Sequence, residues 1–229
     1  MSKISKTQID RLGGRLRKGS PNESDLKTLD DYRRSFGGAY EEVVSGIREK
    51  LKLEPTGRPA KSTSSIIEKL NRESIRLSQV QDIAGCRVVV ADILEQDNIV
   101  ASLKNIFPRA SVVDRRINPS YGYRAVHIII KIFDKLIEVQ IRTELQHSWA
   151  ETSEKFSDKI DPAIKYGGGD KEIQSLLCKV SNLVNDYEKT ERKISTVQKS
   201  SMDKELKDQM ANIKKDIANF INKHAKLFL

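Results

Sequence analysis

A chain of 229 residues, 38% of them hydrophobic and 32% charged, can build the core of one substantial domain with an appendage. It contains no apolar stretch as long as a membrane span and no apolar segment of a secretory signal within residues 1–17, which excludes membrane classes and favours a cytoplasmic protein. The 41 lysines and arginines exceed the 32 acidic residues, and the net charge of +9 favours polyanionic partners: nucleotides, RNA or acidic lipids.

The first third of the chain predicts an arm followed by two helices. Residues 1–24 are basic and contain three glycines, so we expect a flexible arm. Apolar residues recur at three- and four-residue steps over 25–52, which predicts a helix. The proline- and glycine-containing segment 54–59 predicts a break, and residues 62–76 predict a second, short helix.

The middle of the chain predicts a sheet, because short runs rich in valine, isoleucine and leucine are typical of buried strands. We expect strands at 86–90, 111–114, 126–133 and 136–143, a helix at 95–107 and a loop at 118–122. The last two strands are expected to pair antiparallel across a turn at Asp134-Lys135.

The last third of the chain has a helical pattern with a break at 165–170. Helices are expected at 172–196 and 204–226. One stripe of the final helix contains Leu206, Met210, Ile213, Ile217 and Phe220. We expect this stripe to pack on the chain itself, so that residues 170–229 form a helical extension of a domain spanning 25–165. The alternative is an interface through these C-terminal helices, with an antitoxin or a second copy of the chain as partner.

The cysteines and histidines exclude several metal centres. Cys86 and Cys178 are too few and too far apart for a metal knuckle, and we expect reduced structural thiols. The three histidines form no HExxH or His-Asp pair, which excludes a histidine-rich hydrolase centre. We expect His127 to pack, and His147 and Trp149 to pack behind the sheet.

Two acids lie in runs that predict strands, Asp82 in 81–90 and Glu138 in 136–143. We therefore expect both carboxylates on the wall of a sheet. A buried carboxylate costs roughly several kcal/mol unless a cation, a proton or a metal offsets it. Together with Arg87 and Arg142, the two acids favour a divalent cation that holds a polyphosphate, and hence an enzyme.

A basic patch surrounds the predicted start of the second helix. It contains Arg58, Lys61, Lys69, Arg72 and Arg76. The serines among residues 62–65 leave free amides at a helix N-terminus, which favour phosphate oxygens. No Walker P-loop is present. A solvated cationic face explains the same residues equally well.

The loop Tyr121-Gly122-Tyr123 places two aromatic side chains between the acid-bearing runs. Exposed aromatic rings on a loop suit stacking on a nucleobase. The alternative is a tyrosine that packs at a hairpin corner. The position between two acid-bearing runs favours the stacking interpretation.

Four motifs in order, from about Arg58 to Glu151, resemble the RelA/SpoT synthetase domain. They are Lys61…Ser65…Lys69, Asp82-Ile83-Ala84-Gly85-Cys86-Arg87, Tyr121-Gly122-Tyr123-Arg124-Ala125-Val126-His127 and Glu138-Val139-Gln140-Ile141-Arg142-Thr143. Each motif alone is modest, but four in this order and spacing are specific. The resemblance implies an α+β fold, with a nucleotidyltransferase-like mixed sheet flanked by helices and a C-terminal helical extension.

The resemblance also implies a pyrophosphokinase that moves the β,γ-diphosphate of ATP onto a ribose 3′-hydroxyl, with Mg²⁺ as cofactor. Asp82 would hold Mg²⁺, and Glu138 would complete the metal site or accept the hydroxyl proton. The residues implied for ATP are Arg58, Lys61, Ser65, Lys69, Arg72 and Arg87. Those implied for the acceptor are Tyr123, which would stack on its base, and Arg124, His127, Gln140 and Arg142.

The acceptor itself is left open between two classes. With GDP or GTP the product would be the alarmone (p)ppGpp, made by a small member that has only the synthetase. The family's loop usually has Lys after Pro and Asn before Gly-Tyr, whereas this chain has Ser120 and Tyr121. GDP or GTP is the first expectation. This departure, the net charge, the basic segment Arg11–Lys18 and Arg33-Arg34 point to the alternative, the 3′ end of tRNA, which is the acceptor of toxin members that halt translation. A third alternative is a catalytically silent RNA-binding or regulatory module, against which the intact acid pair argues.

Overall fold

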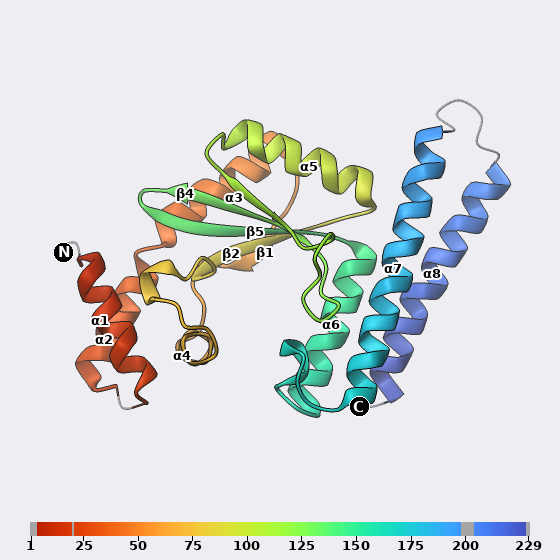
Figure 1. Ribbon diagram of the computed structural model, residues 1–229. Coiled ribbons are helices and arrows are strands. Elements are labelled where there is room, and N and C mark those ends of the chain that lie inside the picture. The colour runs from red at the N-terminus through yellow and green to blue at the C-terminus, as the bar shows by residue number, and fades with distance from the viewer. Residues whose placement is uncertain (1–3, 20, 198–203, 228–229) are drawn as a thin grey trace. The chain divides into compact units, whose positions relative to one another are not determined.

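The computed structural model describes residues 4–19, 21–197 and 204–227. Within them, strands form a five-stranded mixed sheet in the order β1-β2-β5-β4-β3, flanked by helices (Figure 1). The strands are β1 (Thr56–Arg58), β2 (Ala84–Val90), β3 (Ser111–Asp114), β4 (Val126–Ile132) and β5 (Lys135–Thr143). This arrangement confirms the expected α+β fold with a mixed sheet.

Helices occupy much of the remaining chain. They are α1 (Lys6–Arg17), α2 (Glu23–Arg34), α3 (Gly37–Leu51), α4 (Thr63–Arg72), α5 (Ile93–Ile106), α6 (Glu144–Lys159), α7 (Lys171–Val197) and α8 (Lys204–Leu227), with 3-10 turns η1 (Leu77–Gln79) and η2 (Ile164–Tyr166). The helices expected at 95–107, 172–196 and 204–226 are confirmed as α5, α7 and α8. Among the described residues, no helix combines the length and apolar character that crossing a membrane requires.

The chain divides into two compact units. The first comprises residues 1–88, 103–111 and 128–140, and the second comprises residues 89–102, 112–127 and 141–229. Segments from the middle of the chain alternate between the two units, and the division into an arm, a domain over 25–165 and an extension over 170–229 stays a prediction.

The first unit begins with a packed helix. The side chains of Ser5 and Gln8 form a reciprocal capping box at the start of α1, and this helix buries Ile9, Leu12 and Leu16. α1 packs against α2, α4 and η1. The structure thus differs from the flexible arm expected over 1–24, because three apolar residues at helical spacing lie among the basic ones. Residues 1–3 and 20 of that segment lie outside the described residues.

The single helix expected over 25–52 is broken at Ser35-Phe36 into α2 and α3. The buried ring of Phe36 meets Tyr32 edge to face, with ring centroids 5.2 Å apart, and the Lys135 ammonium lies over both rings. The helix therefore breaks where Phe36 packs, and the apolar repeat in the sequence does not reveal this break.

Two further differences concern the strands of the first unit. The break expected at 54–59 contains β1, which pairs antiparallel with β2 in the register Thr56↔Arg87. The turn between β4 and β5 is Phe133-Asp134, one residue earlier than expected, and both residues have positive φ of 47° and 62°. Such a pair of left-handed residues is typical of the tight turn that joins antiparallel strands.

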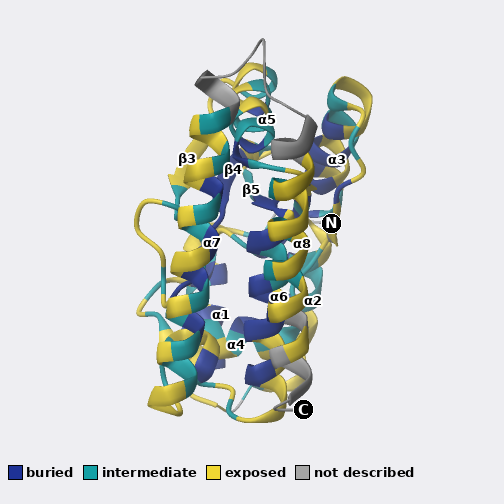
Figure 2. Ribbon diagram, turned by 90° about the vertical axis from the view of Figure 1, so that its right-hand side faces the viewer, coloured by how far each residue is buried: buried dark blue, intermediate teal, exposed yellow. Residues whose placement is uncertain are grey.

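Three helices dominate the second unit. α6 packs against both α7 and α8, which also contact each other, and Figure 1 shows α7 and α8 running side by side. Figure 2 shows exposed residues on the outward sides of α7 and α8 and buried residues between them. One apolar cluster at this packing contains Leu145, Val184 and Ile221.

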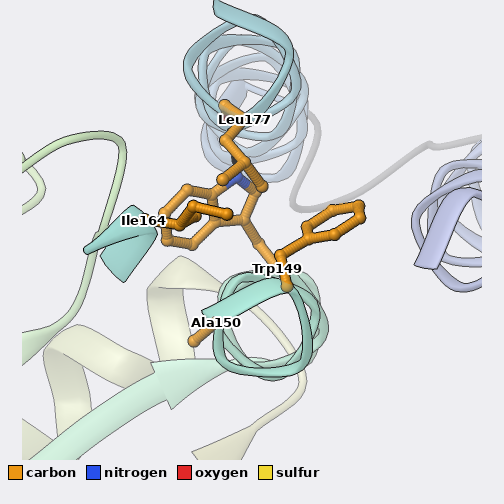
Figure 3. Packing of buried hydrophobic residues seen from close by; sticks show 5 residues of the cluster. Trp149, Ala150, Ile164 and Leu177 are labelled. Atoms are coloured by element: carbon orange, nitrogen blue, oxygen red, sulfur yellow. Dashed lines mark hydrogen bonds between the residues drawn. The ribbon is translucent and has the colours of Figure 1, made fainter. Parts of the chain in front are cut away.

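Trp149 anchors a second cluster with Ala150, Phe156, Ile164 and Leu177, drawn from α6, η2 and α7 (Figure 3). The indole Nε1 donates a hydrogen bond to the carbonyl oxygen of Leu177 at 2.8 Å. Trp149 therefore packs among helices and not behind the sheet, where the sequence analysis placed it, since the C-terminal helices supply the apolar partners.

The apolar stripe expected on α8 is only partly covered. Ile217 packs against the cluster at Val184 and Ile221, while Ile213 and Phe220 are 50% and 44% exposed. The side chain of Leu206 lies outside the described residues. The buried face of α8 thus lies closer to Ile221 than the stripe predicts. Residues repeated at alternating steps of three and four drift around the surface of a straight helix, so they do not all face the same neighbour.

Candidate functional site

Two lysines converge on one carboxylate in the first unit. Asp82 lies in the turn that leads into β2, and its two oxygens face different ammonium groups. Lys61 Nζ lies 2.7 Å from Asp82 Oδ2, and Lys69 Nζ lies 2.9 Å from Asp82 Oδ1. Asp82 therefore lies at the entrance of the strand and not on the wall of the sheet, and the cations that offset it are the two lysines.

Backbone contacts fix Lys61 beside this turn. The Lys61 amide donates to the carbonyl oxygen of Ile83 at 2.6 Å, and Arg33 Nε donates to the carbonyl oxygen of Lys61 at 2.7 Å. Both bonds restrict the backbone from which the Lys61 side chain reaches Asp82. This arrangement explains why a lysine 21 residues before Asp82 reaches it.

Lys69 reaches the same carboxylate from α4. Ser62 caps this helix by accepting a hydrogen bond from the Ser65 amide at 3.2 Å, and Ile66 and Leu70 are its buried face. Burial of these two side chains sets the rotation of α4. Lys69, which precedes Leu70, is thereby directed toward Asp82.

The electrostatics of Asp82 favour its charged form. Burial raises the pKa of this carboxyl, but the charges and hydrogen bonds of Lys61 and Lys69 outweigh burial and lower the pKa to about 2. Asp82 therefore carries a full negative charge at neutral pH. A carboxylate with two ammonium groups around it presents both the ligand type that Mg²⁺ prefers and the cations that phosphates prefer.

Glu138 lies on β5, the neighbour of β2 in the sheet. Gln140 Nε2 donates to Glu138 Oε2 at 2.8 Å. A Cβ added at Gly85 would lie 2.6 Å from the Glu138 carbonyl oxygen, so only glycine permits this approach of the two strands. Burial, and then the Glu138 charge, raises the pKa of the Cys86 thiol to about 12, which keeps it protonated. Cys86 and Cys178 are both free.

The other residues implied for ATP lie on β1, β2 and α4. Arg58 lies on β1 opposite Gly85, with its side chain outside the described part of the chain, and Arg87 lies on β2 opposite Thr56. Ser65 accepts a hydrogen bond from the Ser62 hydroxyl at 2.8 Å. Arg72, near the end of α4, pairs with Glu73 at 3.1 Å.

A second group of polar side chains lies in the second unit. The Tyr123 hydroxyl shares a hydrogen bond of 2.9 Å with His127 Nε2 and accepts one of 3.1 Å from Arg142 Nη2. The Arg142 guanidinium also lies over the Tyr123 ring, 5.0 Å from its centroid. The structure therefore brings together three of the expected acceptor residues, with His127 buried as expected for a packing histidine.

Arg124 has a different environment from the one expected of an acceptor ligand. It is buried and donates to Ser181 Oγ and to Asn182 Oδ1 on α7, each at 3.0 Å, and to the carbonyl oxygen of Arg116 at 2.6 Å. Gln140, as described above, contacts Glu138 in the first unit. Ser181 and Asn182 give no signal in the sequence, because nothing in the pattern of α7 distinguishes them from other polar residues of a long helix.

Tyr121 is the exposed aromatic residue of the loop. Its side chain is 57% exposed, and its φ of 52° is uncommon for a residue other than glycine. Tyr123, in contrast, is partly buried and packs against the Trp149 cluster. The two tyrosines, which the sequence presents as equivalent, thus differ in exposure.

The residues described by the structure contain no group of three or more histidine, cysteine, aspartate or glutamate side chains arranged to hold a metal ion. A metal bound by Asp82 and Glu138 would therefore take its remaining ligands from substrate or water, as Mg²⁺ commonly does. Carboxylate oxygens are the ligand type that Mg²⁺ prefers, so the side chains of Asp82 and Glu138 are of a kind that fits that ion.

Comparison with protein families finds a match for the central part of the chain. Residues 57–159 match the region found in RelA / SpoT proteins. This part of the chain is a RelA/SpoT-type region, which confirms the resemblance drawn from the four motifs. It contains Lys61, Lys69, Asp82, Tyr123 and Glu138 and ends within α6, so α7 and α8 lie beyond it.

Individual proteins extend the comparison. An uncharacterised protein of Mycobacterium tuberculosis is 32% identical over 171 residues, which cover 71% of this chain and 62% of the relative. The chain thus spans less than two thirds of the length of the curated relatives that it matches.

Solved structures share the fold. The small alarmone synthetase 1 of Bacillus subtilis, bound to its product pppGpp, is 22% identical with a TM-score of 0.56, and covers 78% of this chain and 100% of its own. A GTP pyrophosphokinase family protein of Streptococcus pneumoniae is 24% identical with a TM-score of 0.55, and covers 78% of this chain and 97% of its own. Both likenesses concern the fold.

Proposed function

We propose that this protein transfers the β,γ-diphosphate of ATP to the 3′-hydroxyl of GDP or GTP and so makes (p)ppGpp. The observation that carries the proposal is the convergence of Lys61 and Lys69 on Asp82, within a RelA/SpoT-type region. Diphosphoryl transfer needs charge neutralisation and alignment more than a covalent nucleophile. The cluster offers charges of both signs at one place.

The residues of the cluster take distinct roles in this proposal. The ammonium groups of Lys61 and Lys69 bind the ATP phosphates, with Arg58, Arg72 and Arg87 as further cations and Ser65 at the start of α4. Asp82 and Glu138 would hold Mg²⁺, and this ion would supply neutralisation of the charge on the transferred group. When the phosphates replace Asp82 as the partner of Lys61 and Lys69, both lysines remain paired with a negative charge.

The chemical step forms one bond and breaks one bond. The acceptor 3′-oxygen attacks the β-phosphorus of ATP, the bond between that phosphorus and the α,β-bridging oxygen breaks, and AMP leaves. The proton of the 3′-hydroxyl passes to the Glu138 carboxylate, which lies on β5 beside β2.

The acceptor contacts Tyr123, whose ring stacks on its base, and Arg142, whose guanidinium attracts its phosphates. His127 positions the Tyr123 hydroxyl by the hydrogen bond of 2.9 Å. The pppGpp bound to the Bacillus subtilis synthetase supports a guanine nucleotide as acceptor.

A second candidate keeps the chemistry and changes the acceptor to the 3′ end of tRNA. The observation that favours it is the exposed Tyr121, which stands where the family's loop has asparagine, in a chain of net charge +9. An exposed ring on a chain of positive net charge suits a single-stranded nucleic acid. In this case an antitoxin is the expected protein partner.

One assay separates these candidates from a silent RNA-binding or regulatory module. The protein is incubated with Mg²⁺, γ-labelled ATP and either GDP, GTP or deacylated tRNA, and the labelled acceptor is identified. Label in GDP or GTP supports the proposal, label in tRNA supports the second candidate, and absence of label from all three overturns both. Asp82→Asn is the control for contaminating activity, because it removes the carboxylate and should transfer no label.

A further inference from the structure

The loop that carries Tyr123 is held by α7. The Ser181 hydroxyl donates a hydrogen bond of 2.5 Å to the carbonyl oxygen of Gly122, the residue directly before Tyr123. The same hydroxyl accepts a bond of 3.0 Å from Arg124, the residue directly after Tyr123. Ser181 is 2% exposed, so neither loop residue can exchange this partner for water without local opening.

Asn182 completes the hold on Arg124. Its Oδ1 accepts from Arg124 Nη2 at 3.0 Å. Burial lowers the pKa of the Arg124 guanidinium, while the charges of Glu188 and Asp186, also on α7, act in the opposite direction. α7 therefore supplies hydrogen-bond acceptors and compensating charge for an arginine that follows Tyr123 in sequence.

Close packing also restricts the loop at Gly122. A Cβ added at Gly122 would lie 2.7 Å from the Trp149 ring and 3.3 Å from the Ser181 Cβ, and the φ of Gly122 is +87°. The backbone before Tyr123 thus packs closely against α6 and α7, in a backbone conformation that residues other than glycine rarely adopt. Hydrogen bonds and packing together restrict the backbone on both sides of Tyr123.

We propose that Ser181 and Asn182 are positioning residues for the acceptor: they hold Gly122 and Arg124 so that Tyr123 is presented to the acceptor base in one geometry. This inference rests on the proposed function, in which Tyr123 contacts the acceptor. Both residues lie on α7, beyond the RelA/SpoT-type region at 57–159, so the C-terminal extension takes part in acceptor recognition. They act through the loop and do not touch the reacting atoms.

The test combines kinetics with hydrogen exchange. Ser181→Ala removes the bond to Gly122, and Asn182→Ala removes one bond to Arg124 at an exposed position of α7 that tolerates substitution. We expect each variant to raise the KM for GDP, Ser181→Ala by about tenfold, while the KM for ATP stays within about twofold. Asn182→Asp keeps the acceptor oxygen and should restore the wild-type KM. Ser175→Ala, on an exposed position of the same helix, is the matched control and should change nothing.

Hydrogen exchange at the loop reports the hold independently of any activity. The Tyr123 amide donates to the carbonyl oxygen of Ser120 at 2.9 Å, and its exchange should accelerate in Ser181→Ala but not in Ser175→Ala. An unchanged exchange rate of the Tyr123 amide in Ser181→Ala would show that Ser181 does not restrict the loop. Faster exchange with an unchanged KM for GDP, or with equal losses for GDP and ATP, overturns the positioning role. A wild-type protein that labels no acceptor overturns the proposed function, while the exchange data still decide whether α7 holds the loop.

Discussion

Lys61 Nζ and Asp82 Oδ2 are 2.7 Å apart, and this ion pair joins the start of α4 to the entrance of β2. The carboxylate at the centre of the candidate site is therefore compensated by protein cations before any nucleotide binds. Lys69 contributes the second contact at 2.9 Å. In the proposed function, the ATP phosphates would take over these ammonium groups from Asp82, and Mg²⁺ would offset the carboxylate in turn.

The first prediction concerns acid stability. The pKa of Asp82 is about 2 in the folded protein against 3.8 for an ordinary aspartate. A lowered pKa contributes stability that is complete above the unfolded value and is lost as pH falls toward the folded value, here about 2 kcal/mol. Thermal unfolding from about pH 5 to about pH 2 should therefore show a smaller loss for Asp82→Asn than for the wild type. Two curves that stay parallel would contradict the pairing.

The second prediction concerns Glu138. Glu138→Gln keeps an oxygen that accepts from Gln140, so the fold should be retained, as circular dichroism can check. If this carboxylate holds the metal or accepts the proton, kcat should fall at least about a hundredfold with Mg²⁺ saturating. Glu154→Gln, an exposed acid on α6, is the matched control and should keep full activity. Near-normal turnover of Glu138→Gln would remove this residue from the reaction.

The fold follows from the sequence where local pattern decides it. Runs of β-branched residues are observed as β2, β4 and β5, and three- and four-residue apolar steps are observed as α5. The pattern fails at α1, where three apolar positions are too few to stand out among basic residues, and at β1, where three residues carry no periodicity.

The candidate site is predictable in residue type but not in contacts. Asp82 and Lys69 were both identified from motifs, yet their ion pair spans 13 residues of chain and depends on the rotation of α4. The family resemblance implies Arg124 as an acceptor residue. Its partners Ser181 and Asn182 lie 57 and 58 residues later, and only tertiary packing reveals them.

The third prediction concerns Tyr123. Tyr123→Ala should weaken acceptor binding by roughly ten- to a hundredfold, because a lost base stack costs about 1–3 kcal/mol, and should affect ATP far less. Tyr123→Phe keeps the π-face and loses only the hydroxyl contacts with His127 and Arg142, so it should largely restore activity. Separate titrations of GDP and ATP measure both effects. Equal losses for the two nucleotides would show that Tyr123 acts only in packing.

The fourth prediction concerns Glu188 on α7. Burial raises the pKa of this carboxyl, hydrogen bonds from Thr143 and Gln146 oppose the rise, and the neighbouring charges of Glu191 and Arg116 act in opposite directions. A raised pKa contributes stability that is complete below the ordinary value of 4.5 and is lost as pH rises through the folded pKa.

Glu188→Gln removes this titration, so the variant should gain stability relative to the wild type as pH rises from about 5 to about 8. Melting temperatures of the two proteins across this range provide the measurement. The pKa of Glu191 is also raised, mainly by burial, and this residue is present in both proteins. A difference in melting temperature that does not change with pH would contradict the prediction, because it would mean that neighbouring groups fully compensate the charge of Glu188.

The last prediction separates the two acceptors through the basic surface of α1. Arg15 pairs with Asp25 at 2.7 Å and Arg17 donates to the carbonyl oxygens of Leu70 and Ile75, so reversing these charges would disturb the first unit. Arg11 and Lys18 are exposed and suit the test better.

If the acceptor is tRNA and these side chains contact its backbone, the Arg11→Glu, Lys18→Glu variant should flatten the slope of log rate against log salt by about one unit for each lost contact. The rate is measured from about 50 to about 200 mM salt with tRNA and, in parallel, with GDP. With GDP both proteins should give shallow, parallel curves, because a mononucleotide is too small to reach a surface outside its site. A steep dependence that flattens only with tRNA would favour the tRNA acceptor, and shallow curves with both acceptors would count against it. The shared ATP and metal residues cannot make this distinction, since both acceptors would use them in the same way.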